Sequence, residues 1–127
     1  MFENADLIHR YSRADAIRDG VLIDVSAAAR EAGFTYPVAL TAAAWSRCVE
    51  VPRGVMGQDE SGRLWDVLTM LRVAASRPGD DPQELRFAFH VRNDNREWTP
   101  PLLRLKALCG PGDEGEPVIT TLMPDED

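Results

Sequence analysis

Cys109 and His90 are a candidate pair for nucleophilic catalysis, in which a thiol would be the nucleophile and an imidazole its base. A cysteine nucleophile needs a base within hydrogen-bonding distance and a lowered pKa, and both residues lie in segments predicted to be strands. Cys109 falls in the apolar phase of its segment, however, and a free cysteine in such a position is most often simply buried. We therefore expect no catalytic residue, with a small cysteine-dependent enzyme using Cys109 and His90 as an alternative.

Other familiar sites have little support in the sequence. The candidate metal ligands His9, His90, Cys48 and Cys109 lack metal-binding spacing, and the chain contains no CxxC. The glycines of CGPGDEG, residues 109–115, match neither common phosphate-binding motif, and the acids beside them would repel a phosphate. We expect no metal and no cofactor.

The segment QDESGRLWD, residues 58–66, combines acids, an arginine and a tryptophan at the start of a predicted helix. Trp and Arg dominate binding hot spots. The plainer interpretation is a tryptophan at the edge of the core, with acids that complement the helix dipole. The binding hypothesis takes from this segment Asp59, Glu60, Arg63, Trp65 and Asp66.

Negative charge is concentrated near the end of the sequence. The formal net charge is −7, yet residues 1–112 carry 15 acids against 14 bases, and the last 15 residues hold six acids without a Lys or Arg. Such a run is usually solvated, but it can also dock on a basic partner. We include all six in the predicted binding surface and expect residues 124–127 to be flexible. These acids are Asp113, Glu114, Glu116, Asp125, Glu126 and Asp127.

The acidic balance also excludes some classes of function. Direct nucleic-acid binding needs cations to neutralise phosphates, and binding to an anionic membrane surface needs basic clusters. No apolar run approaches the roughly 20 residues that span a bilayer, and the first residues lack a basic signal-peptide region. We expect a cytoplasmic protein with reduced cysteines and one domain over residues 1–127.

Capping residues and apolar spacing predict helices in the first half of the chain. Ser12, with Asp15 three residues later, has the pattern of a capping box, and Ser26 and Thr41 are further candidate caps. One predicted helix begins after Ser12 and ends near Gly20. The others cover residues 27–32, 42–49 and 61–75. The last has an apolar stripe that comprises Leu64, Val67, Leu68, Leu71, Ala74 and Ala75.

Alternating apolar residues predict strands, mostly in the second half. Residues 85–91, 103–109 and 118–123 have this pattern, with turn-forming residues between them. Residues 21–23 form an earlier strand, and residues 38–40 fit either a strand or a helix start. This order predicts an α+β fold: three or four short helices packed on one face of a small, mainly antiparallel sheet with a C-terminal three-stranded meander.

Four long strings carry a family resemblance: YSRADAIRDGVLIDVS from Tyr11, REAGF from Arg30, QDESGRLWDVL from Gln58 and LKALCGPGDEGEPVITTLMP from Leu105. They resemble a bacterial family known only as a domain of unknown function, over almost the whole chain. The resemblance implies an origin on plasmids, integrated elements or phage-related regions, and it supplies no catalytic residues.

Small acidic proteins of mobile elements include inhibitors of host defence, among them anti-CRISPR proteins. The resemblance therefore implies a non-enzymatic inhibitor that blocks a nucleic-acid-binding defence complex, with a CRISPR effector subunit as the specific partner. We expect its acids to engage Arg and Lys clusters that normally hold DNA. The alternatives are the cysteine enzyme and a mobile-element accessory protein that acts as a homodimer.

Overall fold

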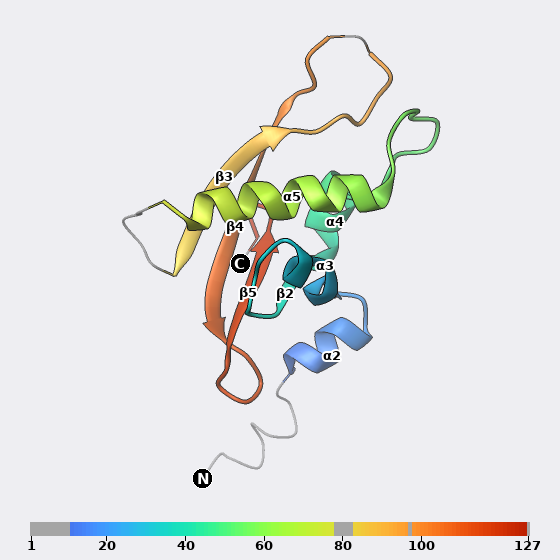
Figure 1. The fold of residues 1–127 in the computed structure, drawn as a ribbon. Coiled ribbons are helices and arrows are strands. Elements are labelled where there is room, and N and C mark those ends of the chain that lie inside the picture. The colour runs from blue at the N-terminus through green and yellow to red at the C-terminus, as the bar shows by residue number, and fades with distance from the viewer. Residues whose placement is uncertain (1–10, 78–82, 97, 127) are drawn as a thin grey trace.

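The computed structural model describes residues 11–77, 83–96 and 98–126. These residues form a five-stranded sheet and four helices (Figure 1). In chain order the elements are α2 (Arg13–Arg18), β1 (Leu22–Asp24), α3 (Ser26–Glu31), β2 (Val38–Thr41), α4 (Ala42–Cys48), α5 (Glu60–Ala75), β3 (Glu84–His90), β4 (Leu102–Pro111) and β5 (Pro117–Leu122).

The strand order is β1-β2-β5-β4-β3, and every pairing but one is antiparallel. Strands β3, β4 and β5 form the predicted meander, with Phe87 opposite Leu105 and Cys109 opposite Ile119. The exception is β2, which runs parallel to β5. Residues 38–40 are thus a strand rather than a helix start, and the predicted α+β class is confirmed.

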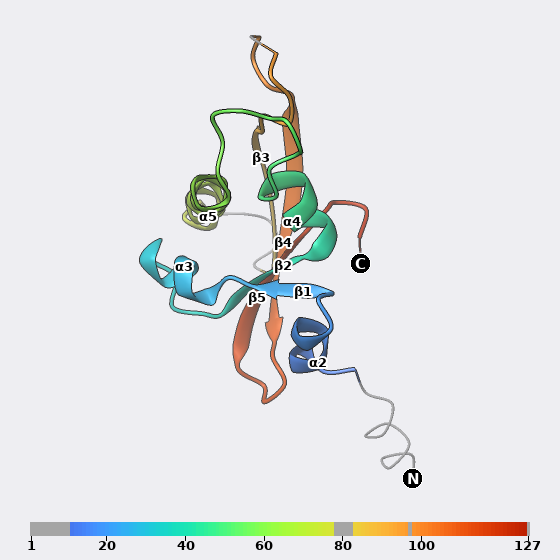
Figure 2. The ribbon, with the colours of Figure 1, turned by 90° about the vertical axis from the view of Figure 1, so that its right-hand side faces the viewer.

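One hydrophobic core joins α3, α4 and α5 to one face of the sheet. Buried Val67, Leu68 and Leu71 of α5 lie in this core with Leu40 and Leu105 of the sheet. Helix α2 lies on the other side of β1 from α4 (Figure 2). Three helices therefore cover one face, while α2 packs separately.

The helix starts follow the predicted capping chemistry at two places. The Ser12 hydroxyl accepts the Asp15 N–H at 2.9 Å and the Asp15 carboxylate accepts the Ser12 N–H at 3.2 Å, which completes the capping box. The Thr41 hydroxyl accepts the Ala44 N–H at 3.2 Å and caps α4.

The predicted cap at Ser26 is wrong, because Val25 is the N-cap of α3 and Ser26 is its first residue. The Ser26 hydroxyl instead donates to Asp24 at 2.6 Å and accepts the Val38 N–H at 3.0 Å. It therefore joins β1 to β2. A cap and such a bridge use the same side-chain oxygen, so the sequence did not distinguish them.

No helix within the described ranges is long and apolar enough to cross a membrane.

Candidate functional site

The turn between β4 and β5 is fixed to the start of α2. The Asp113 carboxylate accepts the backbone N–H groups of Arg13 at 2.7 Å and Ala14 at 3.0 Å. These are first-turn amides that have no partner within the helix, so Asp113 supplies a cap from 100 residues away. The Arg13 guanidinium returns to β5, where it donates to the Thr120 hydroxyl and the Ile119 carbonyl.

The turn itself, residues 112–116, is held by its own hydrogen bonds. The Gly112 N–H donates to the Glu116 carbonyl, and the Glu114 N–H donates to the Glu116 carboxylate at 3.0 Å. Gly115 has a left-handed φ of 82°, which glycine adopts without strain. The carboxylates of Asp113 and Glu116 are therefore held in place before any partner arrives.

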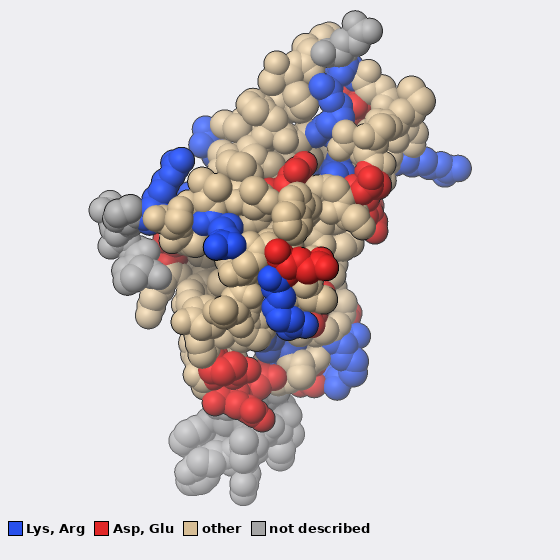
Figure 3. All heavy atoms as spheres, viewed as in Figure 1, with Lys and Arg blue, Asp and Glu red and all other residues tan. Residues whose placement is uncertain are grey.

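This turn and α2 form an acidic end of the molecule, which we define as residues 11–24 and 112–117. It contains six carboxylates against Arg13 and Arg18, a formal charge of −4. Figure 3 shows acidic side chains gathered where the β4–β5 turn lies. Burial lowers the pKa of Arg13, although nearby acids act to raise it. The carboxylates are Asp15, Asp19, Asp24, Asp113, Glu114 and Glu116.

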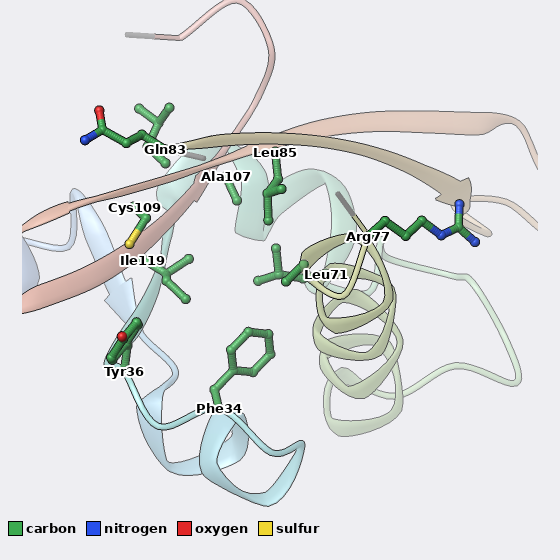
Figure 4. A pocket seen from close by; sticks show the side chains of 11 residues that line it. Phe34, Tyr36, Leu71, Arg77, Gln83, Leu85, Ala107, Cys109 and Ile119 are labelled. Atoms are coloured by element: carbon green, nitrogen blue, oxygen red, sulfur yellow. The ribbon is translucent and has the colours of Figure 1, made fainter. Parts of the chain in front are cut away.

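An apolar pocket of about 390 Å³ lies beside this end, between α5, the sheet and the loop that follows α3. Phe34, Leu71, Leu85 and Ile119 point toward one another across it (Figure 4). Cys109 also lines the pocket and is half-buried. The pocket can therefore bind an apolar group, and no charged side chain has to enter the pocket.

The predicted C-terminal acids do not form one surface. Asp125 and Glu126 follow the far end of β5, about 20 Å of strand from the turn. The Glu126 carboxylate accepts the Thr41 hydroxyl and the Met123 N–H, both at 2.7 Å. Glu126 thus contacts the N-cap residue of α4, and the expected flexibility of residues 124–127 stays a prediction. Asp127 lies outside the described residues.

The predicted segment at the start of α5 is a third, separate location. Asp59 is the N-cap of α5 and accepts the Gly62 N–H at 2.6 Å, while Glu60 lies in the first turn. Trp65 is 48% exposed and Asp66 is exposed. These side chains are accessible, but the structure does not bring them together with the β4–β5 turn of residues 112–116, which we call the acidic turn.

Arg63 belongs to the core rather than to an exposed contact surface. Only 4% of the residue is exposed, and its guanidinium donates to the carbonyls of Cys48 and Arg92 and to the Asn93 side chain. The prediction of Arg63 as a surface anchor is therefore wrong. Its spacing of four from Val67 placed it on the buried face of α5.

The cysteine–histidine alternative fails on geometry. The Cys109 N–H donates to the Gln83 carbonyl beside the start of β3, whereas His90 ends β3 opposite Leu102. Seven residues of strand, roughly 23 Å, separate the two positions, so they cannot share a proton. Cys48 is buried, and this burial raises the pKa of its thiol to about 12.

The described ranges contain no group of three or more His, Cys, Asp or Glu side chains that could hold a metal ion. His9 lies outside those ranges.

The sequence did not predict the pocket or the contact of α2 with the turn. Phe34 and Tyr36 reach the pocket from the short loop after Gly33, where two aromatic residues in a loop were the available signal. Arg13 and Asp113 are 100 residues apart, and neither occurs in a motif that links them. Both features depend on the pairing of β2 with β5, which local patterns do not specify.

Comparison with known families places the whole chain in one family. Residues 1–127 match the family described as "Family of unknown function (DUF6573)", and the chain belongs to it. No curated protein and no solved structure matches the chain.

Proposed function

We propose that this member of a family of unknown function is a non-enzymatic inhibitor, carried by a mobile element, that binds the basic surface of a nucleic-acid-binding defence complex. The acidic end carries the proposal, because it concentrates a formal charge of −4 at one end of the molecule. A surface that normally holds phosphates presents Arg and Lys, which pair with carboxylates through strong charge-assisted hydrogen bonds.

Preorganisation supports this role. Asp113 and Glu116 each accept backbone N–H groups, so their positions are set by the fold. A partner that binds them immobilises fewer flexible side chains than it would on a mobile acidic tail, which lowers the entropic cost of association. Glu114 is exposed on the same turn, and no hydrogen bond to its carboxylate occurs within the described structure.

The proposed mechanism is local rather than a mimic of DNA over the whole surface. The two other groups of predicted acids, at Asp59 and Asp125, lie on different elements. We therefore assign the main contact to the acidic end, with a CRISPR effector subunit as the specific target. Binding through charge at an exposed surface weakens as salt shortens the screening length, which is about 10 Å at 0.1 M.

A pull-down with a matched pair of charge reversals tests the proposal. Glu114→Lys reverses a charge on the acidic turn, and Glu50→Lys makes the same change at an exposed position after α4. The tagged proteins are incubated with lysate of a bacterium that carries a CRISPR system, at about 50 and 300 mM salt. Retained proteins are identified by mass spectrometry.

We expect wild-type protein and Glu50→Lys to retain a nucleic-acid-binding defence subunit at low salt, and Glu114→Lys to lose it. Equal retention by both variants, or retention that salt does not change, contradicts the charge-based mechanism. Recovery of the protein alone removes the inhibitor proposal and favours the homodimeric accessory, which sedimentation then tests.

A further inference from the structure

The apolar pocket between α5, the sheet and the α3–β2 loop has no part in the proposed function so far. Its volume of about 390 Å³ lies near the lower end of the roughly 300–1,000 Å³ typical of ligand pockets. Leu71 at its floor is 1% exposed, whereas Tyr36 at its edge is 46% exposed. The pocket is therefore anchored in the core and open to solvent.

The chemistry of the lining limits what can enter. Leu71, Leu85 and Ile119 are apolar, and the Arg77 side chain at the edge points away from the cavity (Figure 4). Burying an unpaired charge against such groups is costly, whereas removing apolar surface from water is favourable. The inserted part of a ligand is thus apolar and uncharged.

Strands β4 and β5 both line the pocket, and the acidic turn connects these two strands. Cys109 lines the pocket and pairs with Ile119, and two pairs further along Pro111 faces Pro117, where the turn begins. The first acid of the turn, Asp113, is four residues after Cys109, and because β4 ends at Pro111 the two positions are at most about 13 Å apart. An extended peptide covers that distance in about four residues, or in three when a long Lys or Arg side chain supplies the remaining reach.

We infer that the pocket receives one bulky apolar side chain from an extended segment of the basic partner, and that the acidic turn selects segments with Lys or Arg three or four residues away. This inference rests on the proposed function and names the partner's chemistry at the same site. The pocket supplies the apolar contact, and the turn supplies charge complementarity, which favours association with basic segments over acidic ones.

Binding of a model peptide tests the inference directly. The probe is a short fluorescein-labelled Gly/Ser peptide with one Phe and two Lys residues, placed three and four positions from the Phe. Ala75→Trp adds bulk at the pocket's edge, at an exposed position of α5. Thr69→Trp makes a comparable addition at an exposed position on a different face of the same helix and serves as the control.

We expect fluorescence anisotropy to show peptide binding that weakens at least about fivefold with Ala75→Trp and not with Thr69→Trp. Replacing the Phe of the probe by Ser is expected to have the same effect. Circular dichroism melts confirm that both variants fold. No binding of the probe at about 1 mM, or equal affinity for the Phe and Ser peptides, overturns the inference.

The same titrations distinguish this inference from the proposed function. Suppose that Glu114→Lys weakens peptide binding, whereas Ala75→Trp and the Phe-to-Ser change in the probe leave the affinity unchanged. The acidic end then binds basic segments and the pocket has no part. If Ala75→Trp weakens binding while Glu114→Lys does not, the turn does not select cations and the inference fails in its second half. Loss with both variants is the result expected here.

Discussion

Replacing Arg63 tests whether this residue stabilises the fold or contacts a partner. Its guanidinium connects α5 to the end of α4 through the Cys48 carbonyl, and to the β3–β4 loop through the Arg92 carbonyl and the Asn93 side chain. Arg63→Ala removes the donors and leaves three acceptors without them. Two of these are backbone carbonyls that cannot turn away without moving the chain.

The magnitude follows from the hydrogen bonds that are lost. Each bond from a charged donor contributes about 1.5–3 kcal/mol. The total is smaller than the sum of three such bonds, because Asn93 is exposed and water can replace the donor that it loses. We expect Arg63→Ala to lower the free energy of unfolding by about 3–5 kcal/mol, out of the roughly 5–15 kcal/mol that holds a domain together. At about 2.1 cal/mol/K per residue, a loss of 3 kcal/mol over 127 residues lowers Tm by about 11 °C.

Urea denaturation followed by circular dichroism measures this change. Arg63→Lys is expected to recover only part of the loss, because one ammonium group cannot reach three separated acceptors. Arg53→Ala is the control, since Arg53 is exposed and the expected change is within about 0.5 kcal/mol. A loss below about 1 kcal/mol for Arg63→Ala would refute the assignment of Arg63 to the framework.

Three further predictions concern individual side chains. Iodoacetamide should alkylate Cys109 at least about tenfold faster than Cys48 in the folded protein, since burial raises the Cys48 pKa to about 12; peptide mass spectrometry gives both rates, and equal rates contradict the burial. Gly33→Ala should lower the free energy of unfolding by about 1–2 kcal/mol, because Gly33 has a left-handed φ of 102°. Urea denaturation measures this loss, and an unchanged midpoint argues against that backbone conformation. Thr41→Val should lower the free energy of unfolding by about 1–2 kcal/mol, because the Thr41 hydroxyl both caps α4 and donates to Glu126. Glu126→Gln should lower it by less, and a larger loss of Tm for Glu126→Gln than for Thr41→Val contradicts this account.

The local elements of this fold could be predicted from the sequence, because their causes are local. The capping box at Ser12, the cap at Thr41 and the alternation through β3 each depend on residues that are close in the chain. The same reasoning predicted the β3–β4–β5 meander, whose strands are consecutive in the chain and adjacent in the sheet.

The site could be predicted only in part, because its geometry depends on distant segments. Parallel pairing of β2 with β5 brings the α3–β2 loop to the pocket, and alternation does not specify which strands pair. The six C-terminal acids are close in sequence, yet β5 carries Asp113 and Asp125 to opposite ends. Charge composition predicted an acidic surface but could not show that a strand divides it.

Displacement of DNA from a purified CRISPR effector complex tests the central claim most directly. Fluorescence anisotropy follows labelled target DNA on the complex while wild-type protein, Glu114→Lys or Glu50→Lys is added. We predict displacement by wild-type protein and by Glu50→Lys, with at least about fivefold more Glu114→Lys needed for the same effect. Absence of displacement by wild-type protein, or equal potency of the two variants, would contradict inhibition through the acidic end.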